Sequence, residues 1–253
     1  MADVEAHGIR YSVVGEPGDA LVEGFENSGR PYERGLLDFL RPLVSRGDCV
    51  IDVGANIGNH SLYLCLVCEA KVHAFEPNPI ALRHLYANIQ ANSAAELISV
   101  HPVGLGADRS VGSIVPGSQH NLGAARLQVG EGQIPVETID SFEFENVALI
   151  KIDVEGSEVS VLAGAHQTIA TSKPLIVAES RTAAERDAVG DILKRHGYVR
   201  LRKKMASSPT YIYFPSYRAM VSGLLLNLPR MGPNLARNVL RQIRDRLTNQ
   251  RKP

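Results

Sequence analysis

The stretch CVIDVGANIG, residues 49–58, decides the fold of this 253-residue chain. Residues 49–53 are apolar except for Asp52 and predict a buried strand, and the residues from 57 onward predict a helix. Gly54 and Gly58 let the chain turn sharply between these two elements. A strand, a turn of small residues and a helix form the first half of a βαβ unit, whose turn lies at the carboxyl edge of a parallel sheet, where ligands bind.

The residues around this turn indicate what the ligand is. The turn lacks the middle glycine of the dinucleotide-binding pattern and carries Asp52 at the strand end, which would repel a phosphate but could interact with an ammonium group directly or through water. The next predicted strand, residues 72–75, ends at Glu76, whose carboxylate could accept hydrogen bonds from both hydroxyls of a ribose. S-adenosylmethionine, with its cationic amino-acid end and its ribose, fits this description.

Three segments together resemble the FkbM family of S-adenosylmethionine-dependent methyltransferases: IDVGANIG at 51–58, AFEPNP at 74–79 and KIDVEGSE at 151–158. The resemblance implies a class I, Rossmann-like α/β fold with a doubly wound, mostly parallel sheet that ends in an antiparallel strand pair. It also implies that the loop 101–106 forms the wall against the adenine ring. The predicted cofactor-binding residues are Asp52, Gly54, Asn56, Gly58, Glu76, Pro77, Asn78, Val103, Gly104 and Asp153.

An acidic cluster follows the predicted strand 147–152, where Asp153 and Glu155 precede a glycine and a helix that Ser157 is suited to cap. The strand at 174–178 ends in another carboxylate, Glu179. Carboxylates that meet at one rim could remove a hydroxyl proton through a raised pKa, or could together hold Mg²⁺. Glu155 and Glu158 could instead simply favour the helix start, but two carboxylates directly after an apolar strand favour a functional role for Asp153 and Glu155.

Residues 108–132 are rich in glycine and proline and show little helical period, so we expect a long irregular segment there. Within it, residues 115–123 look like a substrate-facing loop, placed where members of the family carry an insertion beside the methyl acceptor. His120 and Asn121 are therefore candidates for gripping or deprotonating a hydroxyl. The alternative for His120 is an ordinary solvated loop histidine.

The chain divides into three parts. Residues 1–46 predict a hairpin, with strands at 9–14 and 20–23, and an amphipathic helix at 32–44. Glu33 in that helix start matches a position often acidic in the family, although a carboxylate there also suits the helix dipole. Residues 47–215 form the methyltransferase domain, with further helices at 79–92 and 181–196, strands at 97–100 and 134–139, and a terminal antiparallel pair at 198–203 and 211–214.

Residues 216–253 form a strongly basic tail whose apolar residues recur at helical spacing. Such a helix could pack back on its own domain or in a homodimer, which we expect first, or could lie on an anionic membrane surface or another partner. The whole chain carries 27 basic and 27 acidic residues, so its net charge gives no bias toward nucleic acid.

Cysteine usage and the N-terminal sequence favour a cytoplasmic protein. The chain has three cysteines, an odd number, and no secretory signal at its start. Cys65 and Cys68 lie within an apolar helical pattern, which favours a pair of small core residues over a redox centre. No apolar run is long enough to cross a bilayer.

These patterns lead to one function hypothesis and two alternatives. We expect O-methylation of a hydroxyl on a sugar, a glycan or a polyketide-like metabolite, with Asp153, Glu155, His120 and Glu179 as candidate catalytic residues. The alternatives are N-methylation of a small amine and a catalytically silent cofactor-binding partner protein. Nucleic acid is not expected as the acceptor, because the sequence at 153–156 is DVEG and lacks the proline-rich aromatic pattern that holds a flipped base.

Overall fold

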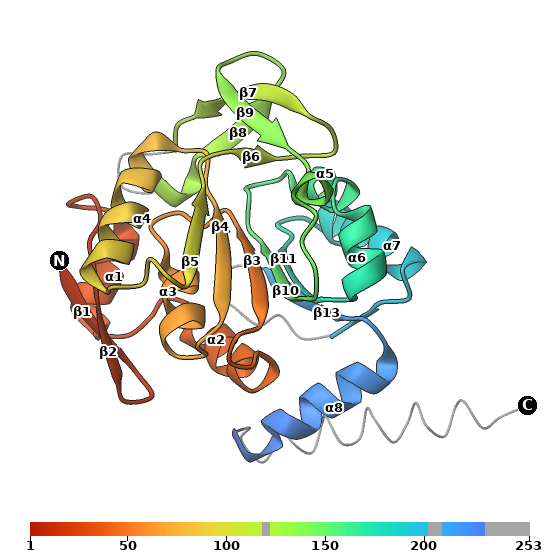
Figure 1. Ribbon diagram of the computed structural model, residues 1–253, viewed down its shortest axis with the longest axis horizontal. Coiled ribbons are helices and arrows are strands. Elements are labelled where there is room, and N and C mark those ends of the chain that lie inside the picture. Colours follow the sequence, from red (N-terminus) through yellow and green to blue (C-terminus); the bar gives the residue numbers. More distant parts are fainter. Residues whose placement is uncertain (118–121, 202–208, 231–253) are drawn as a thin grey trace, which may run out of the picture.

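The computed structural model describes residues 1–117, 122–201 and 209–230, and a seven-stranded sheet lies at its centre (Figure 1). The strand order is β12-β13-β11-β10-β3-β4-β5. The parallel strands are β3 (Cys49–Val53), β4 (Lys71–Phe75), β5 (Ile98–His101), β10 (Val147–Ile152) and β11 (Leu175–Glu179), and the antiparallel edge consists of β13 (Thr210–Phe214) and β12 (Val199–Arg200). This confirms the expected doubly wound sheet with an antiparallel terminal pair.

The order of the strands fixes where a ligand can bind. The chain begins the parallel part of the sheet at β3, adds β4 and β5 on one side, and then crosses over to β10 and β11 on the other side. The carboxyl ends of β3 and β10 are therefore neighbours at the point where the direction of winding reverses. In open α/β sheets, such a reversal separates the loops that follow the two strands and leaves a crevice for a ligand.

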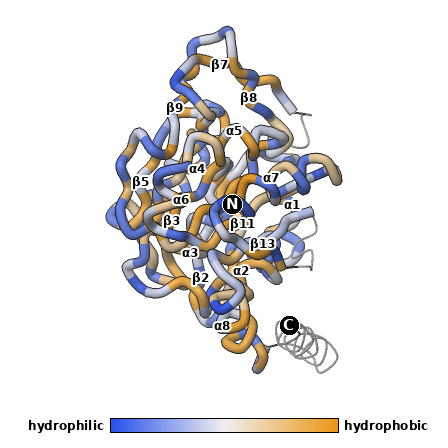
Figure 2. Tube along the Cα trace, turned by 90° about the vertical axis from the view of Figure 1, so that its right-hand side faces the viewer, coloured by the Kyte–Doolittle hydropathy of each residue, from blue (hydrophilic) through white to orange (hydrophobic). Residues whose placement is uncertain are grey.

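Helices cover both faces of the sheet, as the alternation of side chains along its strands requires. Val50 packs with the helices of one face, α2 (Arg34–Leu40), α3 (Asn59–Leu66), α4 (Pro79–Ala91) and α8 (Tyr217–Asn227). Its neighbours Ile51 and Val53 pack with those of the other face, α5 (Glu158–Ala163), α6 (His166–Ser172) and α7 (Ala183–Arg195). In Figure 2 the hydrophobic stretches of β11 and β13 accordingly run through the middle of the molecule.

The N-terminal hairpin uses different strands from those expected. β1 (Ala2–Ala6) pairs with β2 (Ile9–Val13), and the two residues between them, His7 and Gly8, have φ angles of 53° and 82°. Two consecutive residues of positive φ are typical of a tight hairpin turn. The strand expected at 20–23 was wrong, because α1 (Ala20–Ser28) begins there. Asp19 caps this helix by accepting a 2.9 Å hydrogen bond from the backbone N–H of Leu21.

Asn88 on α4 and Asn92, which follows the last residue of that helix, attach the hairpin to the rest of the domain. The side chain of Asn92 accepts a hydrogen bond from the N–H of Ser12 at 2.9 Å and donates one to the carbonyl of Ser12 at 2.7 Å. The side chain of Asn88 accepts a hydrogen bond from the N–H of Val14 at 2.6 Å and donates one to the carbonyl of Val14 at 2.8 Å. Asn88 is fully buried and also donates to the carbonyl of Ile57, at 2.8 Å. A single amide therefore joins the N-terminal segment to the turn that follows β3.

A second sheet stands above the carboxyl edge of the first (Figure 1). Its strands are β6 (Gly104–Leu105), β9 (Ile134–Glu137), β7 (Ser110–Val115) and β8 (Arg126–Val129), in that order. The expectation of an irregular segment at 108–132 was thus wrong in part, because β7 and β8 pair antiparallel within it. Most side chains of these two strands are exposed or half-buried, so they leave little apolar alternation to read in the sequence.

The described part of the C-terminal tail packs on its own domain. Helix α8 begins after Ser216, whose hydroxyl accepts a 3.1 Å bond from the N–H of Ala219. Met220 and Leu224 are buried, and the amide of Asn227 donates to the carbonyl of Phe39 at 3.3 Å. The remaining tail, residues 231–253, lies outside the described residues. Among the described helices, none combines the length and the hydropathy that crossing a bilayer would need.

Candidate active site

A cavity of about 370 Å³ opens at the carboxyl edge of β3, β4 and β10, beneath the second sheet. Two of the predicted cofactor residues, Asp52 and Gly58, do not line it. The remaining predicted residues that the structure describes form its wall: Gly54, Asn56, Glu76, Pro77, Asn78, Val103, Gly104, Asp153, Glu155 and Glu179. Most of the predicted residues therefore meet at one cavity, whereas Asp52 and Gly58 lie behind its wall.

The glycine turn after β3 is tightly enclosed. Gly54 has a φ of 76°, and a Cβ atom at this position would collide with the backbone carbonyl of Asp153. The turn after β3 and the end of β10 can approach each other only because Gly54 has no side chain. Gly58, with a φ of 95°, faces the side chain of Leu85 on α4 instead of the cavity. The missing side chain at Gly58 thus makes room for Leu85, and its predicted contact with the cofactor stays a prediction.

Glu76, at the end of β4, holds its carboxylate at the floor of the cavity. One oxygen accepts a 2.8 Å bond from the N–H of Asn56, and the other accepts a 2.8 Å bond from the N–H of Asn78. Burial raises the pKa of this carboxyl to about 6, even though the two N–H donors favour the charged form. Each oxygen has used one acceptor site on the wall and keeps another for a ligand.

Asp52 occupies a different place from the one predicted. Its side chain is fully buried, accepts a 2.6 Å bond from the hydroxyl of Ser61, and lies 3.1 Å from the ammonium of Lys151. Burial alone would raise the pKa of Asp52, but Lys151, His60 and Ser61 together hold it below its usual value. The sequence predicted that Asp52 could interact with a ligand ammonium directly or through water. In the structure these side chains already enclose the carboxylate, and it does not line the cavity.

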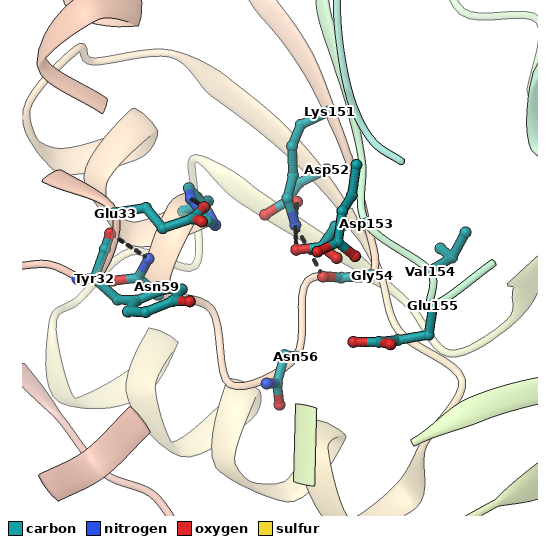
Figure 3. A network of polar contacts seen from close by, with 12 residues as sticks. Tyr32, Glu33, Asp52, Gly54, Asn56, Asn59, Lys151, Asp153, Val154 and Glu155 are labelled. Atoms are coloured by element: carbon teal, nitrogen blue, oxygen red, sulfur yellow. Dashed lines mark hydrogen bonds and ion pairs between the residues drawn. The ribbon is translucent and has the colours of Figure 1, made fainter. Parts of the chain in front are cut away.

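The register of the sheet explains this burial. Asp52 on β3 lies directly opposite Lys151 on β10, so both side chains leave the sheet on the face that α3 covers. The ammonium of Lys151 also donates to the carbonyl of Gly54 at 3.1 Å and lies 3.6 Å from Asp153, as Figure 3 shows. Sequence reasoning missed Lys151, although a lysine within an apolar strand is itself a sign that a carboxylate partner lies nearby.

The three acids at the far rim do converge, as the sequence predicted. One oxygen from each of Asp153, Glu155 and Glu179 lies within 4.8 Å of the others. The guanidinium of Arg181 forms an ion pair with Glu155, and its Nε atom lies 3.5 Å from Glu179. Burial and the neighbouring Asp153 raise the pKa of Glu179 to about 8. Three carboxylates and one guanidinium thus share this side of the cavity, and Arg181 was not anticipated from the sequence.

The loop that carries Asp153 and Glu155 is held in place by a further acid, Glu158. The carboxylate of Glu158 accepts bonds from the N–H groups of Val154 and Gly156, at 3.3 and 3.2 Å. Ser157 precedes α5 but makes no capping bond with its side chain, so the predicted serine cap was wrong. Glu155 adopts a left-handed backbone conformation with a φ of 62°, which is uncommon outside glycine. Strained residues of this kind gather at functional sites.

The N-terminal segment supplies the opposite wall. Tyr32 and Asn59 exchange two hydrogen bonds of 3.1 Å, which fix the chain just before Glu33. Glu33 has a left-handed φ of 54°, a side chain that is 3% exposed, and a carboxylate 3.4 Å from the ring of His60. Both Glu33 and His60 line the cavity. The carboxylate that reaches the cavity on this side is thus Glu33, which the sequence had left open, and not Asp52.

The second sheet forms the roof. Ile114 on β7 and Leu127 on β8 line the cavity, and Leu127 packs so closely on Gly104 that a Cβ there would collide with it. His120 and Asn121 lie outside the described residues, so their predicted role near the acceptor stays a prediction. The roof is apolar where it meets the cavity, whereas the rims on either side are acidic.

Comparison with known proteins matches residues 52–200 to the model of the methyltransferase FkbM domain. In the solved structures, methyltransferase FkbM from Methylobacillus flagellatus KT is 26% identical with a TM-score of 0.54, over 77% of this chain and 52% of that one. The chain is also 33% identical to the hexuronic acid methyltransferase AglP of Haloferax volcanii over 142 residues, which are 52% of this chain and 56% of that protein. It therefore spans about half the length of these two relatives.

A further match is more distant. The chain is 28% identical over 200 residues to the AMB antimetabolite synthetase AmbE of Pseudomonas aeruginosa, of which it covers 9%. The family model spans more than half of the chain, and the matched residues 52–200 include the glycine turn, the acid at the end of β4 and the acidic rim after β10.

Proposed function

The chain belongs to the FkbM methyltransferase family, whose members use S-adenosylmethionine, and on this premise we propose that it methylates a hydroxyl oxygen of a sugar, a glycan or a polyketide-like metabolite. The observation that carries the proposal is the convergence of Asp153, Glu155 and Glu179 on one side of a cavity whose floor carries the carboxylate of Glu76. Transfer to a hydroxyl requires a group that takes its proton, and this rim offers such groups.

The polar groups of the cavity suit the parts of the cofactor. Glu76 keeps one free acceptor site on each oxygen for the two ribose hydroxyls. Phe75 and Val103, which line the cavity beside it, offer apolar surface for the adenine ring. Glu33 on the opposite wall is a carboxylate suited to the ammonium group of the methionine end. The sulfonium would then lie between these two carboxylates, near the open end of β10.

The reaction needs little covalent help from the protein. The acceptor oxygen attacks the methyl carbon, and the carbon–sulfur bond breaks. The electron pair of that bond returns to sulfur, so the leaving group is S-adenosylhomocysteine, whose sulfur is a neutral thioether. The enzyme aligns the oxygen behind the methyl group and excludes water. Asp153, whose side chain is 37% exposed at the cavity, is the best placed acid to receive the hydroxyl proton.

Glu179 can assist by sharing that proton. Burial and the charge on Asp153 raise the pKa of Glu179 to about 8, so this carboxyl takes up a proton more readily than an exposed glutamate does. A proton taken up at this rim is therefore stabilised between two carboxylates. Glu155 is already paired with Arg181 and is better suited to orient the acceptor than to accept the proton.

A sugar acceptor is supported by one relative. The protein AglP, to which this chain is 33% identical over 142 residues, is a hexuronic acid methyltransferase. A second reading, N-methylation of a small amine, draws support from the acids at the rim, which would attract an ammonium group. An amine acceptor must lose its proton before it attacks, so its rate would follow its own ionisation, whereas a hydroxyl acceptor depends on the protein's base.

The test is an activity screen with S-adenosylmethionine labelled in its methyl group. We expect label to move to hydroxylated acceptors such as monosaccharides, uronic acids and glycans, and Asp153→Asn to suppress the transfer. Asp191→Asn, which changes an exposed aspartate on α7, is the matched control and should leave the rate unchanged. Transfer only to amines, with Asp153→Asn fully active, would refute O-methylation.

A further inference from the structure

A positively charged side chain lies within the acidic rim of the cavity. The position of this side chain helps to decide whether a metal ion can bind at the rim. The oxygens of Asp153, Glu155 and Glu179 come within 4.8 Å of one another, close enough to share a single ion. Oxygen ligands from three carboxylates are what Mg²⁺ and Mn²⁺ prefer. The described residues that surround this group nevertheless include two positively charged side chains, Lys151 and Arg181.

Arg181 serves two of the three acids. It follows β11 by two residues, and its guanidinium pairs with Glu155 through Nη2 and lies 3.5 Å from Glu179 through Nε. A guanidinium is planar and presents several N–H groups in a fixed arrangement, so it can hold two carboxylates at once. Lys151 lies 3.6 Å from the third acid, Asp153. Each carboxylate of the triad thus has a cation supplied by the chain.

The backbone is arranged to make this contact. Glu155 takes its left-handed conformation between Val154 and Gly156, whose N–H groups are held by the carboxylate of Glu158. With the loop held in this way, the side chain of Glu155 is only 13% exposed and pairs with Arg181 across the rim. This uncommon backbone conformation thus places the carboxylate of Glu155 beside Arg181.

We propose that Arg181 takes the place of a metal ion in this triad, as a positioning residue that holds Glu155 and Glu179 together and makes methyl transfer independent of Mg²⁺. The proposal rests on the proposed function only for its consequence in catalysis. A unit positive charge about 4 Å from a divalent ion weakens the binding of that ion by a factor on the order of ten to a hundred, even at the dielectric constant of water. A resident guanidinium therefore excludes the ion that the carboxylates alone would attract.

The proposal predicts that removal of the guanidinium creates a metal site. Arg181→Met keeps much of the length of the side chain and removes the charge. We expect this variant to bind Mn²⁺ saturably and at least about tenfold more tightly than the wild type, because the same three carboxylates then lack their cation. Arg181→Lys keeps the charge and should not gain the site. Titration of the full chain with Mn²⁺, followed by electron paramagnetic resonance, measures this without cofactor or acceptor.

Two further variants control the experiment. Arg46→Met removes an exposed arginine from a surface ion pair with Glu69, 3.2 Å long, and should leave Mn²⁺ binding unchanged. Glu155→Gln added to Arg181→Met should remove the new site, since one of its three ligands is lost. Thermal unfolding of every variant shows whether the fold is intact.

Two results would overturn the proposal. One is saturable Mn²⁺ binding to the wild type that Glu155→Gln abolishes, because the triad would then bind metal with Arg181 in place. This arm needs no change at Arg181 and so stands even if Arg181→Met fails to fold. The other is a folded Arg181→Met variant that binds Mn²⁺ no more tightly than the wild type. Neither result bears on whether the chain transfers methyl groups, because neither involves the cofactor.

Discussion

Two acid–base networks lie at the same edge of the sheet, and they differ in how completely they are enclosed. In the inner network, Lys151 and Asp52 are 6% and 0% exposed, and Ser61 satisfies a further oxygen of Asp52. In the outer network, Arg181 is 47% exposed and its partner Glu155 is 13% exposed. Asp52 of the inner network faces helix α3 and only Lys151 reaches the cavity wall, whereas the acids of the outer network all line the cavity.

The contrast teaches that residue type at a strand end does not by itself identify a ligand-binding group. Both networks consist of acidic and basic residues that follow or lie within apolar strands. The inner charges hold the glycine turn and the end of β10 together, because Lys151 binds both Asp52 and the carbonyl of Gly54. The outer acids keep part of their surface open to the cavity and can act on a ligand. The two networks should therefore respond differently to mutation.

The largest effect is expected for Lys151→Met. It leaves Asp52 as a buried charge with Ser61 as its main remaining partner, and breaking a buried ion pair in this way costs about 3–5 kcal/mol of unfolding free energy. Chemical denaturation measures the change. Lys71→Met, which alters an exposed lysine on the neighbouring strand β4, should cost less than about 0.5 kcal/mol. Equal losses in the two variants would show that the inner network does not stabilise the fold.

Asp153→Asn is expected to affect the chemistry and not the fold. Removal of a general base slows turnover by about a thousandfold, equivalent to about 4 kcal/mol of activation free energy. The unfolding free energy should barely change, because Lys151 keeps Asp52 as its partner. Steady-state rates and thermal unfolding measured on the same preparation separate these effects. A variant that unfolds as easily as Lys151→Met would instead place Asp153 in the inner network.

Ser61→Ala sharpens the comparison with a smaller change. It removes the 2.6 Å hydrogen bond to Asp52, and the loss of a buried bond to a charged group costs about 2 kcal/mol. Ser99→Ala, at an exposed position on β5, is the matched control. Denaturation curves of the two variants measure the difference, and coincident curves would mean that the hydroxyl of Ser61 contributes nothing to the buried carboxylate.

The smallest effect is a pH dependence of cofactor affinity that follows Glu76. The pKa of Glu76 is raised to about 6, so the carboxylate that we propose accepts the ribose hydroxyls is lost as the pH falls through that value. Between about pH 7 and pH 5 we expect the affinity for S-adenosylmethionine to fall by about tenfold. Calorimetric titration across this range measures it, with Glu76→Gln as the control that should bind weakly at every pH.

The stability of the ligand-free protein should respond to Glu76 in the opposite sense. The pKa of this group is raised on folding, so the folded state takes up the proton more readily than the unfolded chain. Its contribution to stability is therefore present below the unfolded pKa and is lost as the pH rises through about 6.

The prediction for cofactor affinity has its own contradicting result. If acidification weakened cofactor binding in Glu76→Gln as much as in the wild type, another group would be responsible.

Much of the fold could be predicted from the sequence because apolar runs mark the buried strands. The stretches 49–53 and 147–152 coincide with β3 and β10, since parallel strands covered on both faces are apolar along most of their length. The hairpin at the N-terminus was misplaced because Ala2, Val4 and Ala6 form its buried face with small side chains. Strands β7 and β8 were missed because exposed strands carry no such signal.

Only those residues of the candidate site that directly follow a predicted strand could be predicted from the sequence. Glu76 and Asp153 follow their strands directly, and the topology of the sheet brings them to one edge. The direction in which Asp52 points depends on the register of β3 with β10 and on Ser61 behind it, neither of which the sequence displays. Arg181 and His60 reach the cavity from other elements, so only their positions in space reveal them.

The central claim is that the cavity between Glu76 and Glu33 holds S-adenosylmethionine with its sulfonium toward the acidic rim. A crystal structure of the protein with S-adenosylhomocysteine tests it most directly. We expect both ribose hydroxyls within hydrogen-bond distance of the Glu76 carboxylate, and the sulfur atom facing Asp153. Density for the nucleoside at another place, or with its sugar turned away from Glu76, would contradict the account.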